Sequence, residues 1–118
     1  MKKRLTWMGS SKRDLLAMPV SLHKEFGVAL DIAQQGLTPE GAKPLKGKAS
    51  GAVQLSEDYN SDTYRVVYSV ALDDVLYVLH CFQKKSKKGA ETPKADIDLI
   101  ETRLKAAKAL HHLRKGTE

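Results

Sequence analysis

The 118-residue chain has one cysteine, four histidines and no long apolar run, and each shortage excludes a class of protein. A single cysteine, Cys81, cannot form an internal disulfide, which is typical of a reducing compartment. There are too few Cys and His residues for the usual zinc sites, and no P-loop or dinucleotide-binding fingerprint is present. No apolar stretch approaches the roughly 20 residues that span a bilayer. We therefore expect a cytoplasmic protein with no membrane partner, no metal and no cofactor.

Acidic residues are fewer than basic residues, and the basic residues are unevenly distributed along the chain. The chain has 20 Lys and Arg against 14 Asp and Glu, a net charge of +6. Between Lys48 and Lys84 the only Lys or Arg is Arg65, whereas lysines gather in "AKPLKGK" before this interval and in "QKKSKK" after it. This segregation predicts a polyanionic partner, either nucleic acid or an acidic protein segment. An anionic membrane surface is the weakest alternative, because the apolar helix faces are needed for the core.

The hydrophobic pattern predicts four strands and three helices. Alternation predicts the strands at residues 2–8, 52–58, 63–71 and 75–82. Helical spacing predicts the helices at residues 10–18, 19–36 and from 93 onward. Ser11 and Thr92 are the expected N-terminal caps, and residues 38–51 are expected to form a solvated loop. The result is one α+β domain, residues 1–118, with an N-terminal strand, a helical hairpin, an antiparallel β-meander and a C-terminal helix.

Arg65 stands in the middle of a predicted strand, where a charge that only adds solubility has little purpose. The strands at 63–71 and 75–82 are joined by a short turn, which allows Arg65 and the segment from His80 to Lys84 to share one sheet face. His80 is either a proton-transfer group or a packed core residue. The alternative for Arg65 is a structural ion pair with Asp62, Asp73 or Asp74.

A basic site without a pair of carboxylates suits one reaction of RNA. The 2′-OH of RNA can attack the adjacent phosphorus, so the protein need not supply a nucleophile. Preorganised Lys and Arg can stabilise the charge that develops, and one well-placed donor contributes about 3 kcal/mol. The alternative for the lysine run is a solvated loop that binds polyanions without catalysis.

Four blocks, "KPLKG", "TYRVVYSV", "LYVLHCFQKKSKKG" and "TPKADIDLIETRLKAAK", resemble the RelE/HigB-type toxins of bacterial toxin–antitoxin modules. More narrowly, they resemble the phage-derived branch of the RelE/ParE superfamily that includes the Tad toxins. The resemblance extends from about Lys3 to Lys108. It implies a RelE-like fold and an endoribonuclease that cleaves mRNA on the ribosome. It also implies a cognate antitoxin, commonly a helix-turn-helix protein, through which alone the toxin reaches operator DNA.

The same resemblance implies the site residues. The candidate catalytic residues are Arg65, Lys84, Lys85 and Lys46. The candidates that hold the RNA backbone are Lys43, Lys48, Lys87 and Lys88. His111 and His112 are further candidates, because some RelE-type enzymes use a group near the C-terminus. ParE-type members inhibit DNA gyrase and cleave no RNA, so a gyrase inhibitor and a non-catalytic basic nucleic-acid-binding module are the alternatives.

Overall fold

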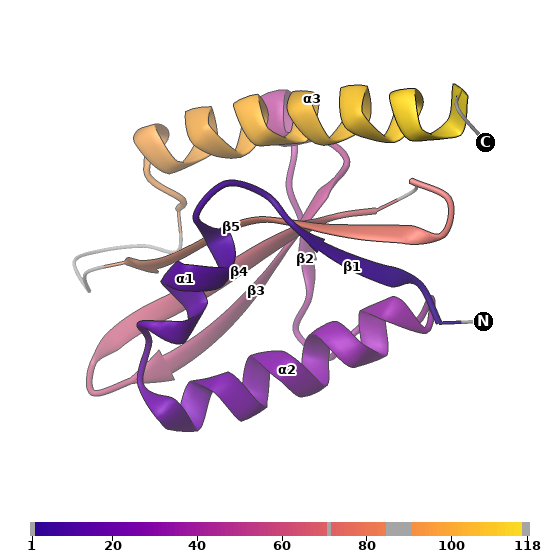
Figure 1. Ribbon diagram of the computed structural model, residues 1–118. Helices are drawn as coiled ribbons and strands as arrows, with labels where there is room; N and C mark the ends of the chain where they lie inside the picture. Colours follow the sequence, from indigo (N-terminus) through magenta and orange to yellow (C-terminus); the bar gives the residue numbers. More distant parts are fainter. Residues whose placement is uncertain (1, 71, 85–90, 117–118) are drawn as a thin grey trace.

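The computed structural model describes residues 2–70, 72–84 and 91–116, which form three layers (Figure 1). A five-stranded sheet lies in the middle. Helices α1 (Ser11–Leu16) and α2 (Val20–Gln34) cover one face, and α3 (Lys94–Gly116) covers the other. The predicted α+β class is therefore confirmed. In the described part of the chain, no helix has the length and apolarity needed to cross a membrane.

The sheet has the strand order β1-β5-β4-β3-β2. Its central part is the predicted antiparallel meander of β3 (Ala52–Tyr59), β4 (Asp62–Ser69) and β5 (Val75–Lys84). Strand β1 (Arg4–Trp7) pairs with β5 in parallel at one edge. The meander thus places its middle strand, β4, at the centre of the sheet.

At the other edge of the sheet, the structure differs from the solvated loop expected at residues 38–51. A two-residue strand, β2 (Lys43–Pro44), pairs antiparallel with β3, and a 3-10 turn, η1 (Gly47–Ala49), follows it. Pro44 has no N–H to donate, which restricts such a residue to an edge strand. A strand this short has no alternation, so no pattern in the sequence could predict it.

Alternation along β4 builds a separate core on each face of the sheet. Val66 and Tyr68 pack with buried residues of α1 and α2, whereas Val67 packs with buried residues of α3. Val66 and Val67 both have 0% of their surface exposed. The central position of β4 explains this burial on both sides.

Strand β5 contains one extra residue. Val67 pairs with His80, but Tyr68 pairs with Val78, so Leu79 has no counterpart in β4. This arrangement is a β-bulge, in which two consecutive residues lie opposite one residue of the partner strand. Before the bulge the odd-numbered side chains of β5 face α3, and after it the even-numbered side chains do.

Side chains from two helices hydrogen-bond to the carbonyl groups at the bulge. Arg103 of α3 donates from Nη1 to the Leu79 carbonyl at 2.9 Å, and Ser11 of α1 donates from Oγ to the Val78 carbonyl at 3.2 Å. Ser11 is the first residue of α1, and its side chain contacts the sheet. The prediction that Ser11 is the N-terminal cap was therefore wrong. A buried carbonyl without a partner is costly, and Arg103 removes that cost at Leu79. The Val78 carbonyl also accepts from the Met8 N–H at 2.9 Å, so Ser11 adds a second hydrogen bond there.

The turn before α1 accommodates Arg103. Gly9 has φ +53°, and a Cβ built there would lie 2.8 Å from the guanidinium of Arg103. Arg103 also donates from Nη2 to Oγ of Ser10 at 3.2 Å, and Ser10 donates to Asp14 at 2.6 Å. Glycine is favoured here both by the positive φ and by the space that the Arg103 guanidinium occupies.

Candidate functional site

On the sheet face that α3 covers, Arg65 lies among side chains from two neighbouring strands. Arg65 pairs with Ser56 of β3 and with Phe82 of β5, and directly opposite residues share a face. Thr63 pairs with Lys84, so Lys84 is a diagonal neighbour of Arg65. The Cα atoms of such neighbours are about 7–8 Å apart. The bulge in β5 therefore gives His80, Phe82 and Lys84 the same orientation as Arg65.

Arg65 is buried, with 4% of its surface exposed. Its Nη1 donates to Oγ1 of Thr92 at 3.1 Å, and Thr92 donates to Oε1 of Gln54 at 2.8 Å. The cap predicted at Thr92 is wrong, because α3 begins at Lys94 and the hydroxyl instead joins Arg65 to β3. Sequence reasoning missed Thr92 and Gln54, since a Thr before a Pro and a Gln in a strand are both commonplace.

The charge of Arg65 is balanced from the start of α3. Burial lowers the pKa of the Arg65 guanidinium, and the Asp96 carboxylate raises it in partial compensation. Arginine stays protonated in proteins, so this is a buried cation near an acid. Of the acids expected to pair with Arg65, Asp73 instead contacts His111 and Asp74 lies 3.9 Å from Arg4. Those two alternatives are therefore wrong.

His80 is oriented by the same acid. Its Nε2 lies 2.7 Å from Oδ1 of Asp96, and its ring stacks on Phe82 with 4.5 Å between centroids. The ring is 7% exposed, and among the described residues its buried Nδ1 has no hydrogen-bond partner. When Nε2 carries the proton shared with Asp96, Nδ1 of the neutral ring is an acceptor.

A groove of about 360 Å³ opens between β2 and the start of α3. Its lining residues are Lys43, Pro44, Leu45, Lys46, Gln54, Glu91, Thr92 and Ile97. Two predicted lysines, Lys43 and Lys46, therefore meet at one groove, and Thr92 connects that groove to Arg65. Lys48 is exposed in η1 and is not part of this lining. Lys85, Lys87 and Lys88 lie outside the described residues.

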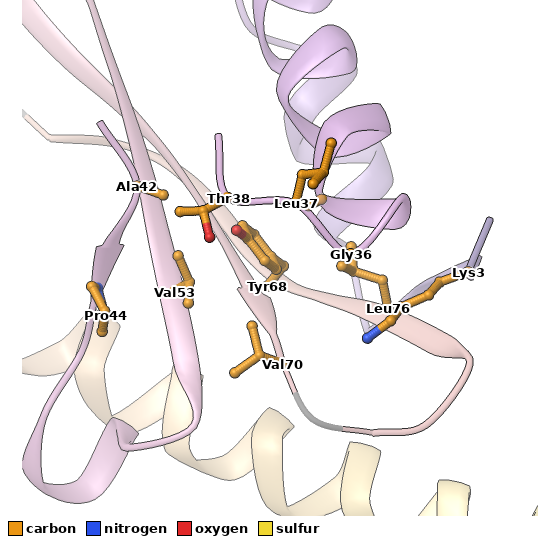
Figure 2. A pocket seen from close by; sticks show the side chains of 11 residues that line it. Lys3, Gly36, Leu37, Thr38, Ala42, Pro44, Val53, Tyr68, Val70 and Leu76 are labelled. Atoms are coloured by element: carbon orange, nitrogen blue, oxygen red, sulfur yellow. The ribbon is translucent and has the colours of Figure 1, made fainter. Parts of the chain in front are cut away.

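A second recess, of about 230 Å³, lies on the opposite face of the sheet, beside the end of α2 (Figure 2). Val53 and Tyr68 line it from the sheet, and Leu37 lies at its α2 side. Burial raises the pKa of the Tyr68 hydroxyl, so that group stays protonated. None of the described residues that line the recess carries a carboxylate or an imidazole, and the recess lies across the sheet from Arg65.

The C-terminal histidines do not join Arg65. Nδ1 of His111 forms a hydrogen bond with the Tyr77 hydroxyl at 3.0 Å, and Nε2 lies 2.9 Å from Oδ2 of Asp73. Asp96 and His111 are fifteen residues apart on α3, which corresponds to roughly 22 Å along the helix. His112 is exposed. The polar cluster around His111 is therefore separate from the one around Arg65.

Cys81 is an unsuitable nucleophile. It is 2% exposed, and burial raises the pKa of its thiol to about 12, with a further rise from Asp14 and an opposing effect from Arg103. Reactive cysteines instead have a lowered pKa and an accessible sulfur. In the ranges that the structure covers, no group of three or more His, Cys, Asp or Glu is placed to hold a metal ion.

The fold and site together define a small α+β protein in which buried Arg65 and His80 and half-buried Asp96 lie beside a groove that two lysines line. A family model described as "Phage derived protein Gp49-like (DUF891)" matches residues 13–105, which include Arg65, His80 and Lys84. The chain belongs to this family. The phage-derived family expected from the sequence is thereby confirmed.

Among solved structures, the chain is similar to one in the crystal structure of the toxin–antitoxin complex RelBE2 from Mycobacterium tuberculosis. The two chains share 18% sequence identity with a TM-score of 0.49, and the match covers 71% of this chain and 100% of the other. No curated protein matches the chain.

Proposed function

We propose that the chain is the toxin of a type II toxin–antitoxin module and that it inhibits translation by cleaving mRNA on the ribosome. The observation that carries the proposal is the buried Arg65, with His80 and Lys84 diagonally across from it in β5 and with the His80 ring oriented by Asp96. The resemblance of four sequence blocks to RelE/HigB-type toxins supports it, as does membership of the phage-derived family.

In the proposed reaction the RNA supplies its own nucleophile. The 2′-oxygen attacks the adjacent phosphorus, the bond to the 5′-oxygen breaks, and a 2′,3′-cyclic phosphate forms. Arg65 and Lys84 stabilise the negative charge on the phosphorane, with Lys46 and Lys85 as further donors. Nδ1 of His80 exchanges a proton with one of the reacting oxygens, while Asp96 holds the ring at Nε2.

The burial of Arg65 sets a condition on substrate binding. Its guanidinium donates to the neutral Thr92 hydroxyl, and a phosphate is a stronger, charged acceptor. RNA binding therefore replaces the Arg65–Thr92 hydrogen bond, and the phosphate takes the place of the Thr92 hydroxyl at Arg65.

The remaining charges fit the partners of such a toxin. Lys43 and Lys48 are exposed, and with Lys87 and Lys88 they bind the flanking mRNA or ribosomal RNA backbone electrostatically. A cognate antitoxin, commonly a helix-turn-helix protein, neutralises the toxin in the cytoplasm and provides its contact with operator DNA.

The proposal is tested by mapping mRNA 5′ ends after brief induction of wild type, Arg65→Ala and a matched control, Arg4→Ala. The Arg4 side chain is 64% exposed and lies in β1, away from the site. New internal ends in translated regions are expected with wild type and Arg4→Ala, and about 100-fold fewer with Arg65→Ala. Lys84→Ala, paired with the exposed Lys12→Ala, repeats the test without altering a buried residue.

Two results would overturn the proposed nuclease activity. Growth arrest with intact transcripts and DNA-damage signalling would indicate gyrase inhibition. Harmless expression, with an RNA affinity that falls steeply with salt, would indicate a non-catalytic binding module. Cleavage that persists in both Arg65→Ala and Lys84→Ala would keep the function and reject the site.

A further inference from the structure

We propose that the groove between β2 and the start of α3 is a subsite for one nucleobase of the RNA, read by the side-chain amide of Gln54. The inference rests on the proposed function and deepens it, because it assigns a part of the substrate to a surface beside the reacting phosphate. Its volume of about 360 Å³ falls in the range of pockets that take small ligands.

The lining of the groove matches the chemistry of a base. Pro44, Leu45 and Ile97 supply apolar walls, and a base has flat faces of low polarity. Among the described residues that line the groove, the uncharged polar ones are Gln54, in the sheet, and Thr92, in the segment before α3. Few polar groups in an apolar recess fix the orientation of a ligand and select among similar ligands.

Gln54 has a defined orientation in this groove. It is 4% exposed, and its Oε1 accepts from the Thr92 hydroxyl at 2.8 Å, so the amide nitrogen points the other way. Within residues 2–70, 72–84 and 91–116, that nitrogen donates to no acceptor. Its two N–H groups are available to acceptors on a base edge.

Charged residues surround the opening. Lys43 and Lys46 are exposed and can hold the phosphate of the same nucleotide. Glu91 is exposed as well, and its carboxylate can accept from an amino group of a base. Mixed charge of this kind suits a nucleotide better than it suits a bare phosphate.

The groove is coupled to the site through one side chain. Thr92 accepts from Arg65 at 3.1 Å and donates to Gln54 at 2.8 Å. The phosphate that replaces Thr92 at Arg65 and the base that contacts Gln54 would therefore belong to neighbouring positions of one strand. The base in the groove should therefore lie at a fixed distance along the RNA from the bond that is cleaved.

The direct test is nuclear magnetic resonance of the full chain, titrated with each of the four nucleoside 5′-monophosphates and with ribose 5-phosphate. At least one nucleotide is expected to shift the Gln54 side-chain amide and the Ile97 methyl signals, while ribose 5-phosphate shifts neither. Gln54→Glu keeps an acceptor for Thr92 but replaces the donors with a second acceptor. It should change the affinity for the preferred nucleotide by about tenfold or more.

Gln35→Glu is the matched control, because Gln35 is exposed at the end of α2 on the other face of the sheet. It should bind the nucleotides as wild type does. Ile97→Ala, which removes a wall of the groove and leaves Gln54 intact, should also weaken binding. Equal shifts with ribose 5-phosphate, or no shift at Gln54 and Ile97 with any nucleotide, would overturn the subsite.

A second measurement separates this inference from the proposed function. If wild type cleaves mRNA, Gln54→Glu should change the preferred base at one fixed position relative to the cut and leave the other positions unchanged. Cleavage with an unaltered base preference would reject the subsite alone. Nucleotide binding without any cleavage would reject the nuclease while the groove remains a nucleotide site.

Discussion

Arg65 is a charged residue in a position where most residues are apolar. Burying a guanidinium is costly unless its charge and its donors are matched. The partners come from sequence positions far from β4: Thr92 at the entry to α3, and Asp96 in its first turn. The start of α3 therefore completes the surroundings of Arg65, so any change that displaces this part of the helix should also disturb the candidate site.

A different residue, Glu57 of β3, predicts a pH dependence. Burial raises the pKa of its carboxyl group, and the nearby Glu25 and Asp58 raise it further. A carboxyl whose pKa is raised by folding destabilises the folded state once it is ionised. Glu57→Gln should therefore increase the free energy of unfolding at pH 7, by no more than about 0.5 kcal/mol because the side chain is partly solvated.

The gain should disappear at about pH 3 and below, where the carboxyl is protonated in the folded and unfolded chains alike. Urea unfolding at the two pH values measures it. Glu101→Gln is the control, since Glu101 lies 3.5 Å from Lys105 and its removal should give no gain. An equal gain for Glu57→Gln at both pH values would show that the carboxylate charge is not the cause.

For single residues, the sequence predicts which charged side chain belongs to the candidate site better than it predicts the contacts of that side chain. Arg65 was predictable because it is the only Lys or Arg in a long acidic interval. Thr92, Asp96 and Gln54 were not, because their roles depend on contacts between residues far apart in the chain. The Thr92–Gln54 hydrogen bond, for example, spans 38 residues.

Among the elements, β5 and α3 depend on each other through the bulge. The carbonyl that the bulge removes from regular pairing accepts from Arg103, and that guanidinium fills the space above Gly9. The sequence could not predict the bulge, because β5 is apolar on both faces and an extra Leu does not interrupt its pattern.

Gly9→Ala should lower stability more than Gly36→Ala does. Both glycines have positive φ, at +53° and +82°, so both alanines carry the cost of the left-handed conformation, about 1–2 kcal/mol. Only at Gly9 does the new Cβ also meet Arg103, whereas the space around Gly36 is open. Chemical unfolding of the two variants measures the difference. Equal losses would mean that Arg103 moves aside without cost.

Over the whole molecule, the 23-residue helix α3 connects two polar clusters. One contains Asp96 near Arg65, and the other contains His111 with Tyr77 and Asp73. The order of the large elements was predictable because each has a clear hydrophobic period. The second cluster was not, since it forms only when α3 packs across the sheet.

The separation of the clusters predicts different outcomes for two substitutions. His111→Ala leaves the buried Tyr77 hydroxyl without its partner and should cost about 1–3 kcal/mol of stability. Because His111 lies far from Arg65, the variant should still cleave mRNA under conditions in which it is folded. Urea unfolding and 5′-end mapping measure the two effects.

His112→Ala is the matched control, since His112 is the exposed neighbour of His111 and should change neither property. Arg65→Ala should show the opposite pattern of His111→Ala, with cleavage lost in a protein that still folds. Loss of cleavage in a folded His111→Ala protein would place a C-terminal histidine in the reaction after all.

The extra residue in β5 also determines how relatives of this chain should be aligned. A relative that is one residue shorter in this strand can pair it regularly with β4 and still present His80 and Phe82 to α3, so the alignment gap belongs at Leu79. A relative of equal length with a regular strand would present Cys81 and Gln83 there instead. Identity in this segment is thus informative about the site only when the position of the gap is known.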